Sequence, residues 1–150
     1  MWECVKFKLV HPDAKMPVKA TSQSAGWDLT VVGYEIVENT YPTTYIYDFG
    51  IAFEIPNGWY GMMCARSSSI YRGMMATSGV GVIDADYRGS VHMAFTNIGT
   101  NFNKIYKVGE RAAQIIFLPI NGTAASPIEI MPAEELSATA RNTCGFGSSN

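Results

Sequence analysis

The chain has 150 residues, of which 47% are hydrophobic, and its formal net charge is -2 at pH 7. This length and apolar content fit one compact domain with its own core and leave no surplus for a second domain. The balanced charge excludes a broad basic field for nucleic acid, so any bound polyanion must be met by a few locally placed cations.

The chain carries no sequence signal for secretion or membrane insertion. The first residues, MWECVKFKLV, mix charged and apolar side chains unlike a signal peptide, and no stretch approaches the roughly 20 apolar residues that span a bilayer. Cys4, Cys64 and Cys144 form an odd set without CxxC spacing, which indicates neither a disulfide framework nor a zinc site. We expect a soluble protein of the cytoplasm, or of the host-cell cytoplasm or nucleus if the source is viral, with no membrane partner.

Short strands separated by turns make up most of the expected structure. In the first of them, Val5, Phe7 and Leu9 alternate with lysines, which is typical of a strand with one buried face. Further strands are expected over residues 28–36, 44–55, 59–65, 91–95 and 112–120, most of them bounded by Gly, Pro, Asn or Asp. One short helical turn, capped by serines, is expected between Arg66 and Arg72. The fold is therefore predicted to be all-β, a sandwich or distorted barrel with at most one short helix.

The composition changes sharply at residue 137. The segment SATARNTCGFGSSN, residues 137–150, is rich in small polar residues and has Phe146 as its single large apolar side chain. Such a segment supplies little to a core. We expect residues 1–136 to form one β-barrel domain and residues 137–150 to form a mobile C-terminal arm.

Three segments carry residues suited to nucleotide chemistry. In GVIDADYRG, residues 81–89, two acids lie between apolar strands, and we interpret the segment as a hairpin that sends Asp84 and Tyr87 into a cleft. In ARSSSI, residues 65–70, an arginine and three hydroxyls follow a strand. In RNTCGFGSS, residues 141–149, an arginine precedes glycines, an aromatic ring and hydroxyls. Taken alone, the three segments are better explained as an ordinary turn, a solvated cap and an unstructured terminus, respectively.

The order of the segments along the chain is more specific. The three are joined by SAGWDL, residues 24–29, and GERAAQIIF, residues 109–117. Together the five resemble the motifs of the trimeric dUTP pyrophosphatase family, AGYDL, PRSS, GVIDxDYRG, GDRIAQL and RGxGGFGST, over roughly residues 3–149. The chain departs from this pattern at three single positions: the family usually has tyrosine in place of Trp27, aspartate in place of Glu110, and often glutamate in place of Ser90. Residues 142–144 are also less rich in glycine than the family motif.

The resemblance implies a role for each matching residue. Asp84 would be the general base that activates a water, and Tyr87 would pack against the deoxyribose and exclude a 2′-hydroxyl. Asp86, Arg88 and Arg111 also match the motifs, but for these we expect structural roles instead: Asp86 and Arg88 hold the segment in shape, and Arg88 and Arg111 form ion pairs. The other substrate-binding residues implied are main chain of Gly81, Val82 and Ile83 for uracil, Arg66, Ser67, Ser68 and Gln114 for phosphates, and Arg141, Phe146, Gly147, Ser148 and Ser149 from the closing tail.

The resemblance also implies a reaction, a cofactor and an assembly. The reaction is hydrolysis of dUTP to dUMP and pyrophosphate, which keeps uracil out of DNA and supplies dUMP for dTMP synthesis. Mg²⁺ would be bound by the triphosphate, with Asp28 holding its water ligands. The assembly is a homotrimer with shared active sites. Two alternatives remain at this point: a dCTP deaminase-like enzyme of the same fold, and a catalytically silent barrel that binds a nucleotide or a protein partner.

Overall fold

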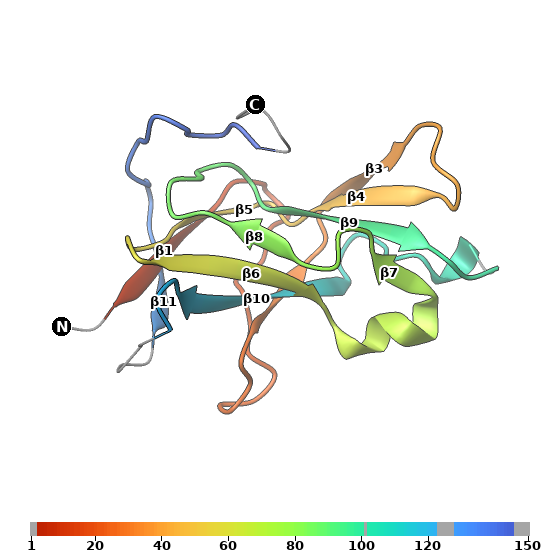
Figure 1. The fold of residues 1–150 in the computed structure, drawn as a ribbon, viewed down its shortest axis with the longest axis horizontal. Helices are drawn as coiled ribbons and strands as arrows, with labels where there is room; N and C mark the ends of the chain where they lie inside the picture. The colour runs from red at the N-terminus through yellow and green to blue at the C-terminus, as the bar shows by residue number, and fades with distance from the viewer. Residues whose placement is uncertain (1–2, 101, 123–127, 146–150) are drawn as a thin grey trace.

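The protein is described by a computed structural model, which covers residues 3–100, 102–122 and 128–145. Three β-sheets surround one core (Figure 1). In spatial order, the first sheet contains β11 (Glu129–Pro132), β1 (Cys4–Leu9) and β5 (Ile51–Glu54). The second contains β2 (Trp27–Thr30), β10 (Arg111–Pro119), β6 (Trp59–Ala65) and β8 (Gly81–Ile83). The third contains β3 (Gly33–Val37), β4 (Thr44–Asp48), β9 (His92–Asn97) and β7 (Met74–Ala76). The expected all-β fold is confirmed.

The helical content of the described residues is small. It consists of two 3-10 helices, η1 (Ser67–Arg72) and η2 (Phe102–Lys104). The helical turn expected after Arg66 is therefore present, but the predicted serine cap is wrong, because Arg66 itself holds the N-cap position and makes no side-chain cap bond. None of the helices in the described ranges is long and apolar enough to cross a membrane.

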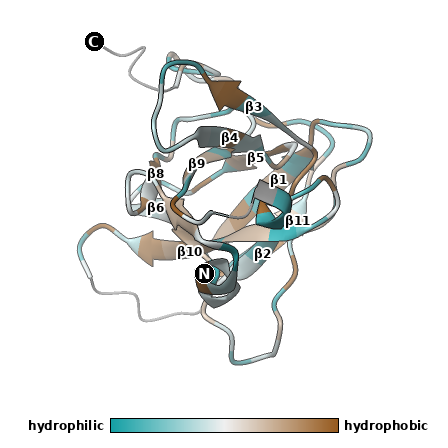
Figure 2. Ribbon diagram, turned by 90° about the vertical axis from the view of Figure 1, so that its right-hand side faces the viewer, coloured by the Kyte–Doolittle hydropathy of each residue, from teal (hydrophilic) through white to brown (hydrophobic). Residues whose placement is uncertain are grey.

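An aromatic cluster fills the centre of the core, which the sheets enclose when viewed along the strands (Figure 2). Tyr47, Phe95 and Tyr106 are each 0% exposed, and their ring centroids lie 5.5–5.9 Å apart. The Tyr47 hydroxyl donates a hydrogen bond of 3.1 Å to the Tyr106 carbonyl. The tilted ring pairs and this bond tie β4 and β9 to the segment that leads into β10.

Two stretches expected as single strands are each divided between sheets. Residues 44–55 break after Asp48, where its carboxylate accepts the Gly50 N–H at 2.8 Å and Gly50 takes a left-handed φ of 64°. Residues 28–36 break at Val31 and Val32, whose N–H groups donate to carbonyls on opposite sides, those of Glu110 and Asp48. Both breaks pass the chain from one sheet to another, so strand propensity alone did not mark them.

The segment 81–89 is not a hairpin, and this prediction was wrong. β8 pairs with β6, whereas β9 pairs with β4 and β7 in another sheet. Buried Val91 fixes the exit, because its N–H donates to the Ile51 carbonyl and its carbonyl accepts the Phe49 N–H. The acidic turn therefore crosses between two sheets, with its two ends anchored on different layers.

β6 sets the distance between the turn after β8 and Arg66 in the second sheet. It pairs with β8 on one side, where Ile83 faces Gly61, and with β10 on the other, where Ala113 faces Ala65. Continuing the first register by one residue brings Asp84 level with Tyr60. Arg66 follows the opposite end of the same strand.

We predict that Tyr47→Phe lowers the free energy of unfolding by about 1–2 kcal/mol, because the buried Tyr106 carbonyl loses its donor while the ring packing remains. Denaturant titration measures this. Tyr34→Phe is the matched control, since the Tyr34 ring lies 5.3 Å from that of Tyr47 but its residue is 44% exposed. Equal losses in the two variants would contradict the role of the buried hydrogen bond.

Candidate active site

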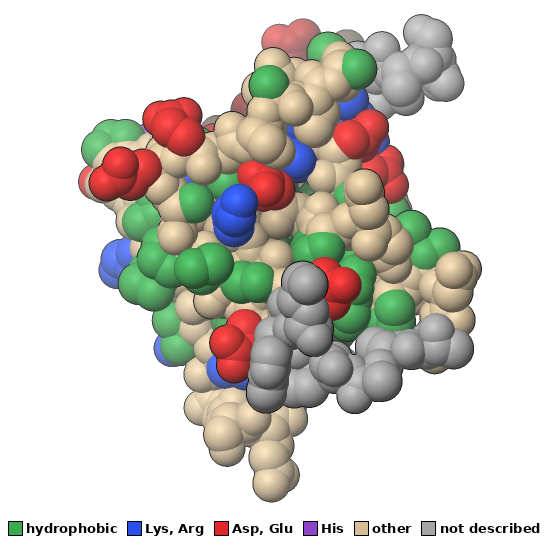
Figure 3. Space-filling view, turned by 90° about the vertical axis from the view of Figure 1, so that its left-hand side faces the viewer, with side chains coloured by type: hydrophobic (Ala, Val, Ile, Leu, Met, Phe, Trp, Pro, Cys, Tyr) green, Lys and Arg blue, Asp and Glu red, His purple; other side chains and the backbone are tan. Residues whose placement is uncertain are grey.

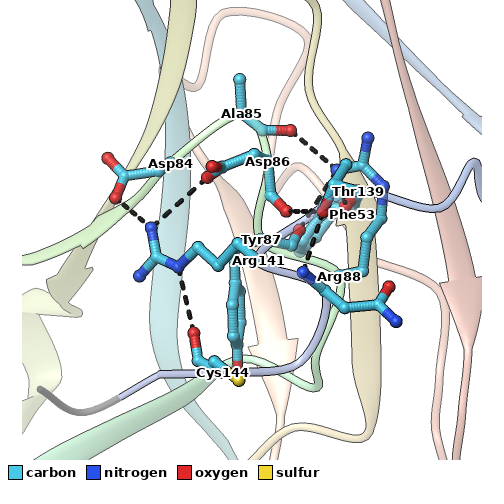
Figure 4. Close-up of polar contacts among 10 residues, drawn as sticks. Phe53, Asp84, Ala85, Asp86, Tyr87, Arg88, Thr139, Arg141 and Cys144 are labelled. Carbon is cyan, nitrogen blue, oxygen red and sulfur yellow. Dashed lines mark hydrogen bonds and ion pairs between the residues drawn. The ribbon is translucent and has the colours of Figure 1, made fainter. Parts of the chain in front are cut away.

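Asp84 lies in the crossing turn directly after β8, with its side chain 53% exposed. Its carboxylate accepts a hydrogen bond from the Arg141 guanidinium, which also lies 3.4 Å from the Asp86 carboxylate (Figure 4). The Nε of Arg141 donates to the Cys144 carbonyl at 3.0 Å. The hydrogen bond to Asp84 raises the pKa of Arg141 above its ordinary value. The tail arginine and the candidate base of one chain are therefore in contact.

Tyr87 is held on several sides. Its hydroxyl donates to the Ser90 carbonyl at 3.0 Å, and the Arg141 guanidinium lies 5.4 Å from its ring centroid. Gly89 and Gly145 lie against the ring, and a side chain at Gly89 would overlap the phenol. Burial raises the pKa of Tyr87, so the hydroxyl stays protonated and acts as a donor.

A cavity of about 270 Å³ opens beside this ring. Its lining includes Gly81, Val82 and Ile83 from β8, together with Tyr87 and Arg141. β8 is the edge strand of its sheet, so one row of its main-chain N–H and C=O groups points away from β6. Fixed main-chain donors and acceptors at a cavity of this kind form a template for the edge of a planar base.

Arg88 connects the turn after β8 to neighbouring segments through hydrogen bonds to main-chain carbonyls. Its guanidinium donates at 2.7 Å to the carbonyls of Ala85 and Ser137 and at 3.4 Å to that of Phe53. Arg88 thus holds the turn in shape, as predicted, but the predicted ion pair is wrong. The partners of its guanidinium in the described part of the chain are carbonyl and hydroxyl oxygens. Because Ser137 begins the tail, Arg88 joins the tail, the turn and β5.

A second polar cluster surrounds Asp28 on β2. The Asp28 residue is 7% exposed, and its two oxygens lie 3.1 Å from Nε of Arg66 and 3.3 Å from Nη1 of Arg111. The expected structural ion pair of Arg111 is therefore confirmed. Gln114 stands opposite Asp28 in the strand register and donates to the Ala65 carbonyl at 3.4 Å. Ser67 and Ser68 follow Arg66 in the first turn of η1, so the predicted phosphate contacts lie together.

The two clusters lie at opposite ends of β6 (Figure 1). Six residues separate the level of Asp84, opposite Tyr60, from Arg66. At about 3.3 Å per residue, this separation is roughly 20 Å. Within one chain, the candidate base therefore lies next to Arg141 of the tail but far from Arg66 and the serines that follow it.

The donors near Asp28 suit a cation only if the ligand supplies most of its coordination. The described residues contain no group of three or more His, Cys, Asp or Glu side chains that could hold a metal. Both Asp28 oxygens already meet arginines, although each carboxylate oxygen has a second lone pair for a water. These donors therefore fit a hydrated Mg²⁺ carried on phosphates and do not form a separate protein cage.

A family model described as dUTPase matches residues 12–150. This chain belongs to the dUTPase family. Two relatives named deoxyuridine 5′-triphosphate nucleotidohydrolase agree with this. That of Escherichia phage T5 is 36% identical over an alignment of 150 positions that covers 97% of each chain. That of fowlpox virus is 41% identical over an alignment of 137 positions that covers 90% of this chain and 89% of the relative.

Solved dUTPase structures share the fold. A dUTPase of Staphylococcus bacteriophage 80alpha, solved with dUPNHPP, superposes with a TM-score of 0.63 at 24% identity over 97% of this chain and 98% of that chain. The dUTPase of Streptococcus mutans gives a TM-score of 0.63 at 24% identity over 76% of this chain and 94% of that chain. These likenesses agree with a distorted, jelly-roll-like β fold for this dUTPase chain.

Several residues of the candidate site were not predicted from the sequence, and others that were predicted lie outside the described residues. Phe146, Gly147, Ser148 and Ser149 lie outside the described residues. Thr139 donates to the Asp86 carbonyl and Asn142 accepts the Arg88 N–H at 2.6 Å, yet neither stood out in the tail. His92 lines the cavity beside Tyr87, although its place on an alternating strand gave no reason to expect it there.

Charge is dispersed over the face of this dUTPase that carries the N-terminal end of β1. Acidic side chains are prominent on this face, and the basic side chains are scattered among them without gathering into one field (Figure 3). Such a surface agrees with the charge balance of the sequence, in which 11 Lys and Arg accompany 13 Asp and Glu.

We predict that Arg88→Lys lowers the free energy of unfolding by about 1–3 kcal/mol, because an ammonium cannot reproduce the planar fork that meets carbonyls on three segments. Thermal unfolding measures the change. The control is Arg111→Lys, whose side chain is 47% exposed and should cost less than about 1 kcal/mol. A larger loss in Arg111→Lys would contradict the bridging role of Arg88.

Proposed function

We propose that this chain is a dUTP diphosphatase that hydrolyses dUTP to dUMP and pyrophosphate. The observation that carries the proposal is the contact between Asp84, directly after β8, and Arg141, which lines the β8 cavity together with Tyr87. The chain's relatives, matched over most of their length, bear the nucleotidohydrolase name. The reaction would remove dUTP from the nucleotide pool of the cytoplasm, or of the infected cell, and supply dUMP for dTMP synthesis. The absence of such turnover would leave a silent nucleotide-binding barrel as the alternative.

Asp84 would act as the general base. In this role its carboxylate takes a proton from a water as the water oxygen bonds to the α-phosphorus, and the bridging oxygen leaves with pyrophosphate. A carboxylate is a weak base, so its placement beside the phosphorus matters more than its basicity. The contact with Arg141 supports this role, because a guanidinium that moves from the carboxylate to the phosphates would leave Asp84 free to accept the proton.

Recognition of the nucleoside would fall to β8 and Tyr87. The outward main chain of Gly81, Val82 and Ile83 would pair with uracil, since fixed groups left unpaired by an exocyclic amine disfavour cytosine. Tyr87 would pack on the deoxyribose and leave no room for a 2′-hydroxyl. The 270 Å³ cavity and the tightly held ring support this assignment.

The phosphates would be met by a neighbouring subunit of a homotrimer. Arg66, Ser67, Ser68 and Gln114 would bind them there, because Arg66 of one chain lies roughly 20 Å from Asp84 along β6 and Gln114 pairs with Cys64 near the same end of that strand. Exposed apolar side chains beside the cavity support contact with another subunit there, because Val80 (47% exposed) and Val82 (58%) line the cavity.

Mg²⁺ would accompany the triphosphate, with Asp28 holding one or more of its waters. When bound, it would neutralise part of the phosphate charge and fix the phosphate conformation. The arm formed by residues 137–150 would then close over the nucleotide, with Arg141, Ser148 and Ser149 on the phosphates, Gly147 allowing close approach of the main chain, and Phe146 on the base. Closure of this kind excludes bulk water from the reacting centre.

We expect purified protein with Mg²⁺ to release pyrophosphate from dUTP and much less from dCTP or dTTP. Asp84→Asn should lower turnover by roughly 10²-fold or more with little loss of nucleotide affinity, the scale of a lost general base. Asp86→Asn is the matched control, because Asp86 is similarly exposed and also contacts Arg141.

Three results would each contradict part of this proposal. Ammonia released from dCTP would favour a deaminase of the same fold, and no turnover at all would favour a silent barrel. An Asp86→Asn variant that is impaired as strongly as Asp84→Asn would move the base away from Asp84.

A further inference from the structure

Three polar side chains outside the five motif segments meet behind Tyr87: Asp48, Ser90 and His92. The Ser90 hydroxyl donates to Oδ1 of Asp48, and the His92 Nδ1 lies 2.8 Å from the Ser90 carbonyl oxygen. The His92 Nε2 lies 3.6 Å from Oδ2 of Asp48. The same Ser90 carbonyl accepts the Tyr87 hydroxyl at 3.0 Å.

Asp48 belongs to the rigid part of the molecule. It ends β4, pairs in register with His92 of β9, and accepts the Gly50 N–H on the same oxygen that receives the Ser90 hydroxyl. Its carbonyl accepts the Val32 N–H at 2.9 Å. Through Ser90, the Tyr87 phenol is therefore bonded to the third sheet as well as to its own turn.

The bonding at the Ser90 carbonyl is fully used. A carbonyl oxygen only accepts, so Nδ1 of His92 carries the proton in this contact, and the two donors occupy both lone pairs. A hydroxyl that donates to an ionised carboxylate makes a stronger bond than a neutral pair. The Ser90–Asp48 bond thus fixes the backbone position on which the phenol depends.

Little other freedom remains to the ring. Gly89 and Gly145 lie against it, and His92 and Tyr87 line the same cavity. A small displacement of Ser90 would therefore move the ring relative to the space that the sugar would occupy.

We propose that Asp48, Ser90 and His92 are positioning residues that set the depth of the Tyr87 ring and, through it, the discrimination of deoxyribonucleotide from ribonucleotide. This inference rests on the proposed function, in which Tyr87 packs on the deoxyribose. None of the three residues touches the reacting atoms. Their effect should fall on selectivity and KM more than on kcat.

The first test compares Ser90→Ala with Ser90→Thr, which keeps the hydroxyl. Ser90→Ala should lower the dUTP-over-UTP ratio of kcat/KM by about tenfold, the effect of one charge-assisted hydrogen bond, while Ser90→Thr should stay within about threefold of the wild type. Asp48→Asn should resemble Ser90→Ala, because the bond then loses its charge. An unchanged ratio in Ser90→Ala and Asp48→Asn would overturn the proposal.

A double-mutant cycle with Tyr87→Phe separates positioning from general loosening of the fold. Tyr87→Phe keeps the ring but removes the hydroxyl that the Ser90 carbonyl binds. Ser90→Ala should therefore cause no further loss of selectivity in that background. A merely structural role would lower unfolding temperatures and give additive effects on the ratio, and additivity would contradict the proposal.

Binding measured without turnover distinguishes failure of this inference from failure of the proposed function. Calorimetry with dUMP and UMP gives an affinity ratio that does not require hydrolysis. We expect Ser90→Ala to lower this ratio about tenfold as well. If Ser90→Ala leaves the dUMP-over-UMP affinity ratio unchanged, or if this ratio is near one in the wild type, the positioning role of the three residues is overturned even in an active enzyme. If the ratios are as expected but dUTP is not hydrolysed, only the enzymatic proposal is contradicted.

Discussion

The register of β6 with its two neighbours is the constraint on which the rest of the site depends. β8 pairs with one edge of β6 and ends at the acidic turn, while β10 pairs with the other edge and carries Gln114 beside Asp28. A paired strand cannot slip by one residue along its neighbour without turning its side chains to the other face of the sheet. The distance of roughly 20 Å between Asp84 and Arg66 is therefore built into the sheet.

This separation gives the two ends of the sheet different chemistry. One end has an apolar cavity, an edge strand and an aromatic ring, which suit a nucleoside. The other has Arg66 and Arg111 around one buried carboxylate, which suit a phosphate chain and its cation. At both ends of the sheet the arginine guanidinium groups form ion pairs with aspartates. Bound phosphates would therefore exchange with these carboxylates as partners of the arginines. In the proposed trimer, a nucleotide that needs both ends would be bound between subunits.

The sequence predicted the local features well. The strand over residues 59–65 was placed at its observed bounds, because glycine and small polar residues interrupt the apolar run on both sides. The clusters around Asp84 and Asp28 were anticipated by residue type within ordered motifs. The errors lay in features decided by distant partners. The turn after β8 was mistaken for a hairpin because Val91 is fixed by Phe49 and Ile51, about forty residues earlier.

The polar support of the site was harder to predict for the same reason. Arg88 was expected to pair with an acid, but carbonyls of Phe53 and Ser137 surround it once the tail and β5 pack together. Asp48 and Ser90 lie 42 residues apart and carry no motif, so their contact behind Tyr87 follows only from the register of β4 and β9. Local propensity cannot specify such contacts, whereas tertiary packing does.

The most direct test is complementation between two inactive variants, Asp84→Asn and Arg66→Ala, each confirmed as a folded trimer. If the base and the phosphate contacts of one site come from different subunits, random mixing at equal amounts should restore about one quarter of wild-type turnover, because about three quarters of the trimers hold both variants and each of those has one intact site in three. Unmixed variants should stay inactive. A mixture with no more activity than the separate variants would show that Asp84 and Arg66 act within one chain, contrary to the geometry of β6.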